Sequence, residues 1–400
     1  MRMKVWVKIL IGSVIGAILG WFLPSDNQTV IGALTWLFDM GIRMGRYIVA
    51  PVLIFSLAIS ACELRRERLF LRLIGRSFLV LCASALFVVV AGVLTVRILP
   101  AIRIPIVSED QIPIVTLDLA ENITSLFPSN MFAVLVSDGV YLLPACLFAL
   151  FFGIGLSNTR SFTKPVVEFV DSLSRIFYYI MTIFVEFWGL LLIVLSAYWA
   201  FQFRGVLAEG VFLPVIILLG CLSLVLGFFI LPLFFYLFRR KENPWNVLKC
   251  SFGTAVAGFI SGDINFTIPL IIHNLKEDHG VKRKVSAVTI PLFAIFGRAG
   301  SAMVAVVSLM VVIQSYTGIA VSFVDMLLIC LGGFVISLVL ARFPGTGAYT
   351  ALAVLCLNFG SGFEAGYLLF KPIAFYLIAM GTFLDAMIAS FATYVIGKKD

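Results

Sequence analysis

The sequence predicts an all-α polytopic membrane protein, and three observations support this fold class. Of the 400 residues, 62% are hydrophobic and only 12% are charged, whereas an average soluble domain has about 25% charged residues. The mean hydropathy is +1.10. Several apolar runs also reach the length of about 20 residues that a helix needs to span a bilayer. In lipid such a run forms a helix, because a helix satisfies its own backbone hydrogen bonds.

Spanning segments are expected throughout the first half of the chain. They fall near residues 5–23, 30–61, 77–99, 176–200 and 211–238, with a more broken apolar region at 126–156. The first run begins among Arg2, Lys4 and Lys8, as a signal peptide would, but no small-residue cleavage pattern follows it. We therefore expect it to be a spanning helix. Two charges in the second run, Arg43 and Arg46, are expected to face protein or to snorkel towards the interface.

The net charge of +8 lies mainly in short loops between apolar runs, so it predicts topology rather than nucleic-acid binding. The basic groups expected on the cytoplasmic side are Arg65, Arg66, Arg68, Arg72, Arg76, Arg160, Lys164, Arg239, Arg240, Lys241 and Lys249. The stretch 100–122, with Glu109, Asp110, Asp118 and Glu121, is expected to be an external loop. Both termini are then cytoplasmic, in a plasma or inner membrane.

Loop charges also predict two re-entrant hairpins. The apolar stretch 250–275 has basic clusters on both sides, and a full crossing would put one of them outside. A hairpin that enters the membrane and returns avoids this, with its tip at Asp263 to Pro269. After a span at 285–313, the segment 324–360, broken at Arg342–Gly347, must also turn back before a last helix at 371–396. We expect about eight spanning helices and two hairpins, arranged as an inverted repeat around a midplane site.

Polar residues at membrane depth mark the candidate site. Asp263, Asn265 and Arg298 lie in apolar surroundings, close to the helix breakers Gly262, Pro269, Gly297 and Gly300. Ionisable groups are costly in a bilayer and are functional-site candidates by default. Irregular backbone is tolerated there only where it is buried in protein or lines a watery cavity.

Four short motifs, in this order, resemble the glutamate transporter family, also called the dicarboxylate/amino acid:cation symporters. They are Ala50–Leu57 (A-P-V-L-I-F-S-L), Phe127–Phe132 with the later Leu143-Pro144 and Phe148-Ala149, Asn265–Pro269, and Phe343–Gly347 (F-P-G-T-G). The resemblance covers nearly the whole chain. It implies a homotrimer with an elevator mechanism. Residues 1–245 would be mainly scaffold, with the third and sixth helices contributing to the core, and residues 246–400 would form the transport core.

The chain departs from this family where sodium is bound. The family motif N-M-D-G-T on the seventh helix reads Gly297-Arg-Ala-Gly-Ser301 here, so Arg298 stands in place of Met, and the Asn and Asp are absent. On the last helix, Gly381 or Thr382 takes the place of an Arg that reads an acidic substrate, and Ala389 or Ser390 takes that of an Asp. Sodium needs several oxygen ligands, preferably with a carboxylate. Sodium coupling is therefore expected to be lost or reduced.

Our hypothesis is that the Arg298 guanidinium stands in for a cation and pairs with Asp263, with Asp385 or with a substrate carboxylate. Two alternatives remain open at this stage. The three side chains could form a structural ion pair or triad with no ligand. One of the carboxylates could instead carry a coupling proton.

The resemblance and these residues together predict a substrate site and a function. The site comprises Asp263, Ile264, Asn265, Thr267, Arg298, Pro344, Gly345, Thr346, Gly347, Thr382 and Asp385. Arg342 is expected either to lie at the external mouth or to reach the substrate, and Glu186 to lie at an interfacial or helix-packing position or at the core. The expected function is secondary transport of a small organic solute, an amino acid or (di)carboxylate. The alternatives are a typical sodium-coupled symporter and a non-transporting anion channel or sensor.

An enzyme is not expected, because the chain has no nucleophile–base pair, phosphate loop or metal-ligand spacing. The seven cysteines are scattered singly through apolar segments and are interpreted as packing thiols. We expect neither a cofactor nor a metal, and the predicted partners are a small-molecule substrate, the lipid bilayer and identical subunits.

Overall fold

The computed structural model describes residues 4–24, 27–99, 104, 119–136, 139–158, 160–238, 244–318, 321–360 and 362–397, and every regular element in these ranges is a helix. Several residues used above lie outside the described ranges: Glu109, Asp110 and Asp118 of the acidic stretch, and Arg239, Arg240 and Lys241. Seven helices or continuous helical segments among the described residues are long and apolar enough to cross a membrane.

The first half of the chain supplies the peripheral helices and the largely buried α3. They are α1 (Val5–Phe22), α2 (Gln28–Tyr47), α3 (Val49–Arg66), α4 (Phe70–Ile98), α5 (Leu119–Thr124), η1 (Met131–Leu135), α6 (Leu143–Leu156), α7 (Arg160–Glu186), α8 (Trp188–Glu209), α9 (Leu213–Val225), η2 (Leu226–Ile230) and α10 (Leu231–Phe238). Helix α2 continues into α3 through a bend at Ile48. Pro51 causes this bend, because it has no N–H to donate to the carbonyl four residues earlier.

One expected span in this half differs from the structure, and the broken apolar region contains no full-length span. The segment predicted at 176–200 is divided, because α7 ends at Glu186 and α8 begins at Trp188. Only α8 is apolar enough to be a candidate span, since the earlier part of α7 carries Lys164, Glu168, Asp171 and Arg175. The broken region at 126–156 contains the 14-residue α6, which is shorter than a full span.

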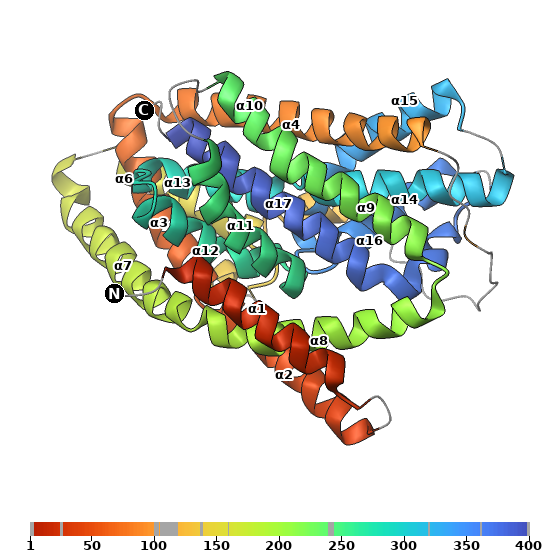
Figure 1. Cartoon of the computed structure of the whole chain (residues 1–400). Helices are drawn as coiled ribbons and strands as arrows, with labels where there is room; N and C mark the ends of the chain where they lie inside the picture. The colour runs from red at the N-terminus through yellow and green to blue at the C-terminus, as the bar shows by residue number, and fades with distance from the viewer. Residues whose placement is uncertain are drawn as a thin grey trace.

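The second half forms the centre of the molecule. Its elements are α11 (Pro244–Ser261), α12 (Ile264–Glu277), α13 (Arg283–Ile290), η3 (Pro291–Phe296), α14 (Ala299–Thr317), α15 (Phe323–Ser337), η4 (Leu340–Arg342), α16 (Gly347–Phe359), η5 (Gly366–Ile373) and α17 (Ala374–Gly397). Helix α14 packs against α4, α16 and α17, and it is buried from Ala299 to Gln314. Figure 1 shows α14 and α17 across the middle, with α4 on one side and α1, α2 and α8 on the other.

The two predicted hairpins are present as helix pairs, α11 with α12 and α15 with α16, and each pair is in contact. The tip of the first hairpin was predicted at Asp263 to Pro269, but the break is only Gly262 and Asp263, and Pro269 lies inside α12. Gly262 turns the chain with φ +65°, a left-handed conformation that favours glycine. Asp263 then caps α12 at once, so the residues after it are helical.

The beginning and end of the chain lie on the same side of the molecule (Figure 1). The Lys4 ammonium lies 3.5 Å from the Asp278 carboxylate, and Gly397 packs against Val281. Both ends of the described chain therefore meet the loop between α12 and α13. The C-terminal residues 398–400 lie outside the described residues.

Candidate functional site

Three helix breaks meet at one place in the centre of the molecule. They are Gly262–Asp263 between α11 and α12, Gly297–Arg298 between η3 and α14, and the segment between α15 and α16. The backbone N–H of Arg298 donates to the Ser337 carbonyl at 2.9 Å, and that of Ile264 reaches the Pro344 carbonyl at 3.4 Å. Broken helices meeting in this way leave backbone groups that ligands or side chains must satisfy.

Arg298 lies at the middle break and is completely buried. Its Nε donates to Asp385 Oδ2 of α17 at 3.1 Å, its Nη1 to the Phe343 carbonyl at 2.5 Å, and its Nη2 to Ser301 Oγ at 3.0 Å. A buried charge is tolerated only when it is paired and hydrogen-bonded. One guanidinium thus joins α14, α17 and the tip of the second hairpin.

Asp385 completes this arrangement from the other side. Its Oδ1 accepts the backbone N–H groups of Gly300 at 2.7 Å and Ser301 at 3.2 Å, and its Oδ2 accepts the Ser301 hydroxyl at 2.6 Å. A carboxylate from α17 therefore caps the N-terminus of α14, where the free N–H groups and the helix dipole favour negative charge. Of the two carboxylates considered for Arg298, the structure pairs it with Asp385.

Asp263 has a different role. Its Oδ1 accepts the N–H groups of Asn265 at 2.7 Å and Phe266 at 3.2 Å, as an N-cap does. Its Oδ2 pairs with Nη2 of Arg46 on α2. The first N–H groups of α12 are therefore occupied by the protein's own carboxylate. Arg46 was noted in the sequence only as a charge in an apolar run, and its partner 217 positions away could not be found from sequence.

The tip of the second hairpin lies between the two ion pairs. A Cβ atom at Gly347, the first residue of α16, would overlap the Arg298 guanidinium, so the guanidinium lies directly against this glycine. At Gly345 a Cβ would be 3.2 Å from Nη2 of Arg46 and 3.3 Å from Oδ2 of Asp263. Pro344 is buried and Thr346 is exposed. Helix α16 has no side-chain hydrogen bond at its N-cap, unlike α12.

The remaining predicted site residues contact backbone carbonyls, two of them far away in the sequence. Asn265 Nδ2 donates to the Val140 carbonyl at 2.9 Å, and the Thr267 hydroxyl donates to the Ile264 carbonyl at 2.7 Å. The Thr382 hydroxyl lies 2.9 Å from the Gly258 carbonyl of α11, so it faces the first hairpin. Ser390, at one of the two possible positions of the family's carboxylate, donates to the Ala386 carbonyl of its own helix at 2.8 Å.

Two outlying charges make ion pairs near the surface. Arg342 pairs with Glu121 at 3.1 Å, and both side chains are exposed, as expected of a mouth residue. Glu186 pairs with Lys8 of α1, which agrees with a helix-packing position. Among the described residues, no group of three or more His, Cys, Asp or Glu side chains could hold a metal ion.

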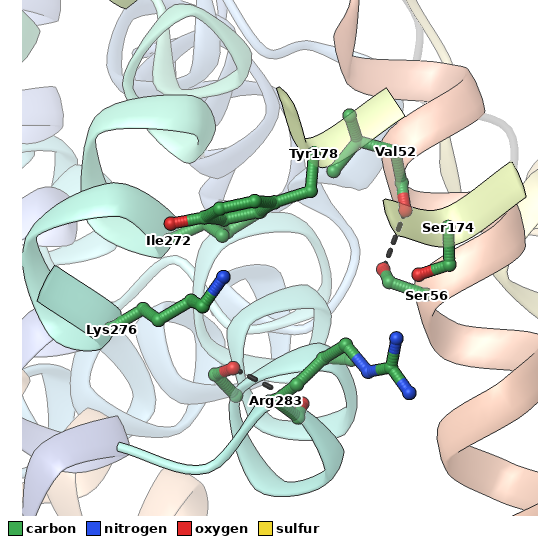
Figure 2. Close-up of a pocket in the computed structure, with 9 residues that line it drawn as sticks. Val52, Ser56, Ser174, Tyr178, Ile272, Lys276 and Arg283 are labelled. Atoms are coloured by element: carbon green, nitrogen blue, oxygen red, sulfur yellow. Dashed lines mark hydrogen bonds between the residues drawn. The ribbon is translucent and has the colours of Figure 1, made fainter. Parts of the chain in front are cut away.

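A separate small pocket of about 30 Å³ lies between α3 and α7 on one side and α12 and α13 on the other (Figure 2). It has room for about one or two waters. The Lys276 ammonium lies 3.3 Å from the centre of the Tyr178 ring, and Arg283 lies 2.7 Å from Asp171. Burial would raise the pKa of Asp171, but its hydrogen bonds and ion pairs with Arg283 and Arg175 lower it overall. This charged cluster fastens α12 and α13 to α7.

The chain is similar in sequence to several known transporters. Human excitatory amino acid transporter 1 is 22% identical over 221 residues, which cover 54% of this chain and 40% of that protein. The neutral amino acid transporter B(0) of Oryctolagus cuniculus is 25% identical over 226 residues, with the same coverage. The aligned region thus spans less than half the length of these mammalian relatives. The serine/threonine transporter SstT of Streptococcus agalactiae serotype III (strain NEM316) is 26% identical over 306 residues, covering 74% of this chain and 71% of that protein.

The sequence profile of the sodium:dicarboxylate symporter family matches residues 5–399, almost the entire chain. The family resemblance drawn from the short motifs is therefore confirmed. The chain belongs to the sodium:dicarboxylate symporter family.

Proposed function

We propose that the chain is a secondary active transporter of a small organic solute, an amino acid or a (di)carboxylate, in which Arg298 replaces a bound cation. The observation that carries this proposal is the position of the Arg298 guanidinium. It is fully buried at the break before α14, and it binds Asp385, Ser301 and the Phe343 carbonyl together. These contacts join two parts of the predicted core: the helices α14 and α17, and the tip of the second hairpin.

The oxygens around Arg298 are of the kinds that a hard cation uses. They are a carboxylate oxygen of Asp385, the hydroxyl of Ser301 and the carbonyl of Phe343. Hard cations take carboxylate, hydroxyl and carbonyl oxygens as ligands. In this structure the two hairpin tips are in contact, an arrangement that we call closed. Because the Arg298 guanidinium already neutralises Asp385, this closed arrangement needs no sodium ion beside Asp385. This supports lost or reduced sodium coupling, with proton coupling or exchange as the remaining ways to drive transport.

The N-terminus of α16 is the best candidate for the anionic group of the solute. Its first N–H groups have no side-chain cap, and the guanidinium of Arg298 lies against Gly347. Helix N-termini next to a cation favour carboxylates. The first hairpin is less suited, because Asp263 already occupies the N–H groups of Asn265 and Phe266. An uncharged Gly381 or Thr382 on α17 and the names of the relatives favour an amino acid.

The chain is an integral multi-pass membrane protein, as the family and the seven long apolar helical segments among the described residues indicate. We further propose a plasma or inner membrane location with cytoplasmic termini, supported by the basic loops and by the contact of both chain ends with one loop. A homotrimer, a scaffold mainly within 1–245 and an elevator-like core at 246–400 follow from the family resemblance. Membership of a symporter family fits the expectation that the chain is not an enzyme.

The second candidate is a non-transporting relative that acts as an anion channel or a sensor. One observation favours it: Arg298 and Asp385 are satisfied by protein groups alone in this closed arrangement. Fold alone does not separate the two functions.

Purified protein should be stabilised by its solute to the same extent in sodium and in choline buffers. A ligand that binds only the folded state raises the melting temperature by mass action, by an amount equivalent to about 2.7 kcal/mol at 100 times its Kd. The measurement is a thermal-shift screen of amino acids and dicarboxylates in both buffers and across pH, followed by uptake of each hit into proteoliposomes. Uptake that requires a sodium gradient would refute the cation replacement. Binding without uptake would favour the sensor.

A further inference from the structure

Arg46 reaches the centre of the molecule from a helix that lies outside the predicted core. It is on α2, which packs against α8 and contacts α12. Its guanidinium pairs with Oδ2 of Asp263 at the tip of the first hairpin. The Asp263 side chain is 2% exposed and the Arg46 side chain 23% exposed. The ion pair therefore has one end in the protein interior and the other within reach of solvent.

The same ion pair lies against the tip of the second hairpin. Gly345 lies so close that a Cβ atom there would be 3.2 Å from Nη2 of Arg46 and 3.3 Å from Oδ2 of Asp263. The Ile264 N–H next to Asp263 also points to the Pro344 carbonyl, 3.4 Å away. Both hairpin tips thus meet at one ion pair, and one half of that pair is anchored on α2.

We propose that Arg46 is a positioning residue that holds the two hairpin tips together through Asp263. We call the Arg46–Asp263 ion pair the latch. The latch has to open whenever a tip moves to admit or release solute. This inference rests on the proposed function for its purpose, but the latch itself is a property of the closed structure. The proposal gives a residue on α2 a role in the transport cycle, although α2 lies outside the predicted core that holds Arg298 and Asp385.

The chemistry of the pair suits a latch that opens and closes. Asp263 keeps its Oδ1 bonds to the N–H groups of Asn265 and Phe266 when Oδ2 is released, so α12 stays capped. Arg46 is long and partly exposed, so its head group can turn towards water when it is released. Separating the tips here therefore costs the Arg46–Asp263 ion pair and the contact of the Ile264 N–H with the Pro344 carbonyl, and it leaves α12 capped.

Hydrogen–deuterium exchange of the full chain in nanodiscs tests the latch without any need for solute. In Arg46→Gln, peptides covering the two tips, 258–268 and 338–350, should exchange about tenfold faster, because local opening is governed by the local free energy. A peptide from α14 should be unchanged and serves as the internal control. Arg46→Lys should restore most of the protection, because it keeps the charge. Arg43→Gln, an exposed arginine one turn earlier on α2, should behave as the wild type.

A double-mutant cycle with Asp263→Asn, which can still cap α12, distinguishes a latch from a general loss of stability. If Arg46 acts through Asp263, the double variant should exchange no faster at the tips than Arg46→Gln alone. Unchanged tip exchange in Arg46→Gln, or equal acceleration in α14, would overturn the latch. A confirmed latch in a protein that takes up no solute would instead count against the proposed function alone.

Discussion

Replacing Arg298 by methionine is expected to lower the free energy of unfolding by about 3–5 kcal/mol, because removing one partner of a buried ion pair leaves the other charge uncompensated. The guanidinium is fully buried and makes three hydrogen bonds. Because the site is closed to solvent, water cannot replace these bonds when the guanidinium is removed. The loss should be measured as a lower midpoint in thermal or denaturant unfolding of the detergent-solubilised protein.

The matched control is Arg342→Met, the same substitution at the exposed pair with Glu121. Exposed ion pairs contribute about 0–1 kcal/mol. The control should therefore unfold close to the wild type. A change at Arg298 as small as the one at Arg342 would mean that the buried pair is dispensable for the fold.

The same variant also tests the exchange of a cation for an arginine. Removing the guanidinium leaves a space lined by three oxygen ligands. They are the Asp385 carboxylate, the Ser301 hydroxyl and the Phe343 carbonyl. We therefore expect sodium, but not choline, to raise the melting temperature of Arg298→Met, while the wild type responds to neither. Equal melting curves of Arg298→Met in both salts would argue for the plain structural ion pair instead.

Gly300→Ala is expected to destabilise the protein by about 1–3 kcal/mol, the usual cost of forcing an extra methyl group into a packed interior. A Cβ atom there would lie 2.8 Å from the backbone nitrogen of Asp385 and 2.8 Å from the carbonyl oxygen of Gly381. Backbone atoms cannot rotate aside, so α17 has to move. That movement also lengthens the bond from the Gly300 N–H to Asp385 Oδ1, now 2.7 Å, and should weaken solute binding.

Gly205→Ala in α8 is the control for this substitution, because no atom lies within 4 Å of the added methyl position. In an open helix interior, alanine is about 0.5–1 kcal/mol more favourable than glycine. Unfolding midpoints should therefore move in opposite directions in the two variants. Equal shifts would show that the close approach of α14 and α17 at Gly300 is not a tight constraint.

Much of the fold followed from patterns that are local in the sequence. Apolar run lengths gave most of the spanning helices, and the basic loops on both sides of 250–275 required a hairpin there. Both hairpins are present. The errors concern boundaries: the tip at Gly262–Asp263 is shorter than expected because Asp263 caps α12 immediately. The span expected at 176–200 is split at Phe187, since hydropathy does not register a helix break.

By itself, the sequence determined that the chain is a membrane protein of this family and that helices break at Gly262 and Gly297. That Arg298 stands where the family binds a cation is a proposal that the sequence suggested. Only the tertiary structure decided the pairing of its charges. Arg298 pairs with Asp385, 87 positions away, and Asp263 pairs with Arg46, 217 positions away. Run length and charge count depend on neighbouring residues, whereas an ion pair depends on which helix faces which. That is set by the packing of the whole core.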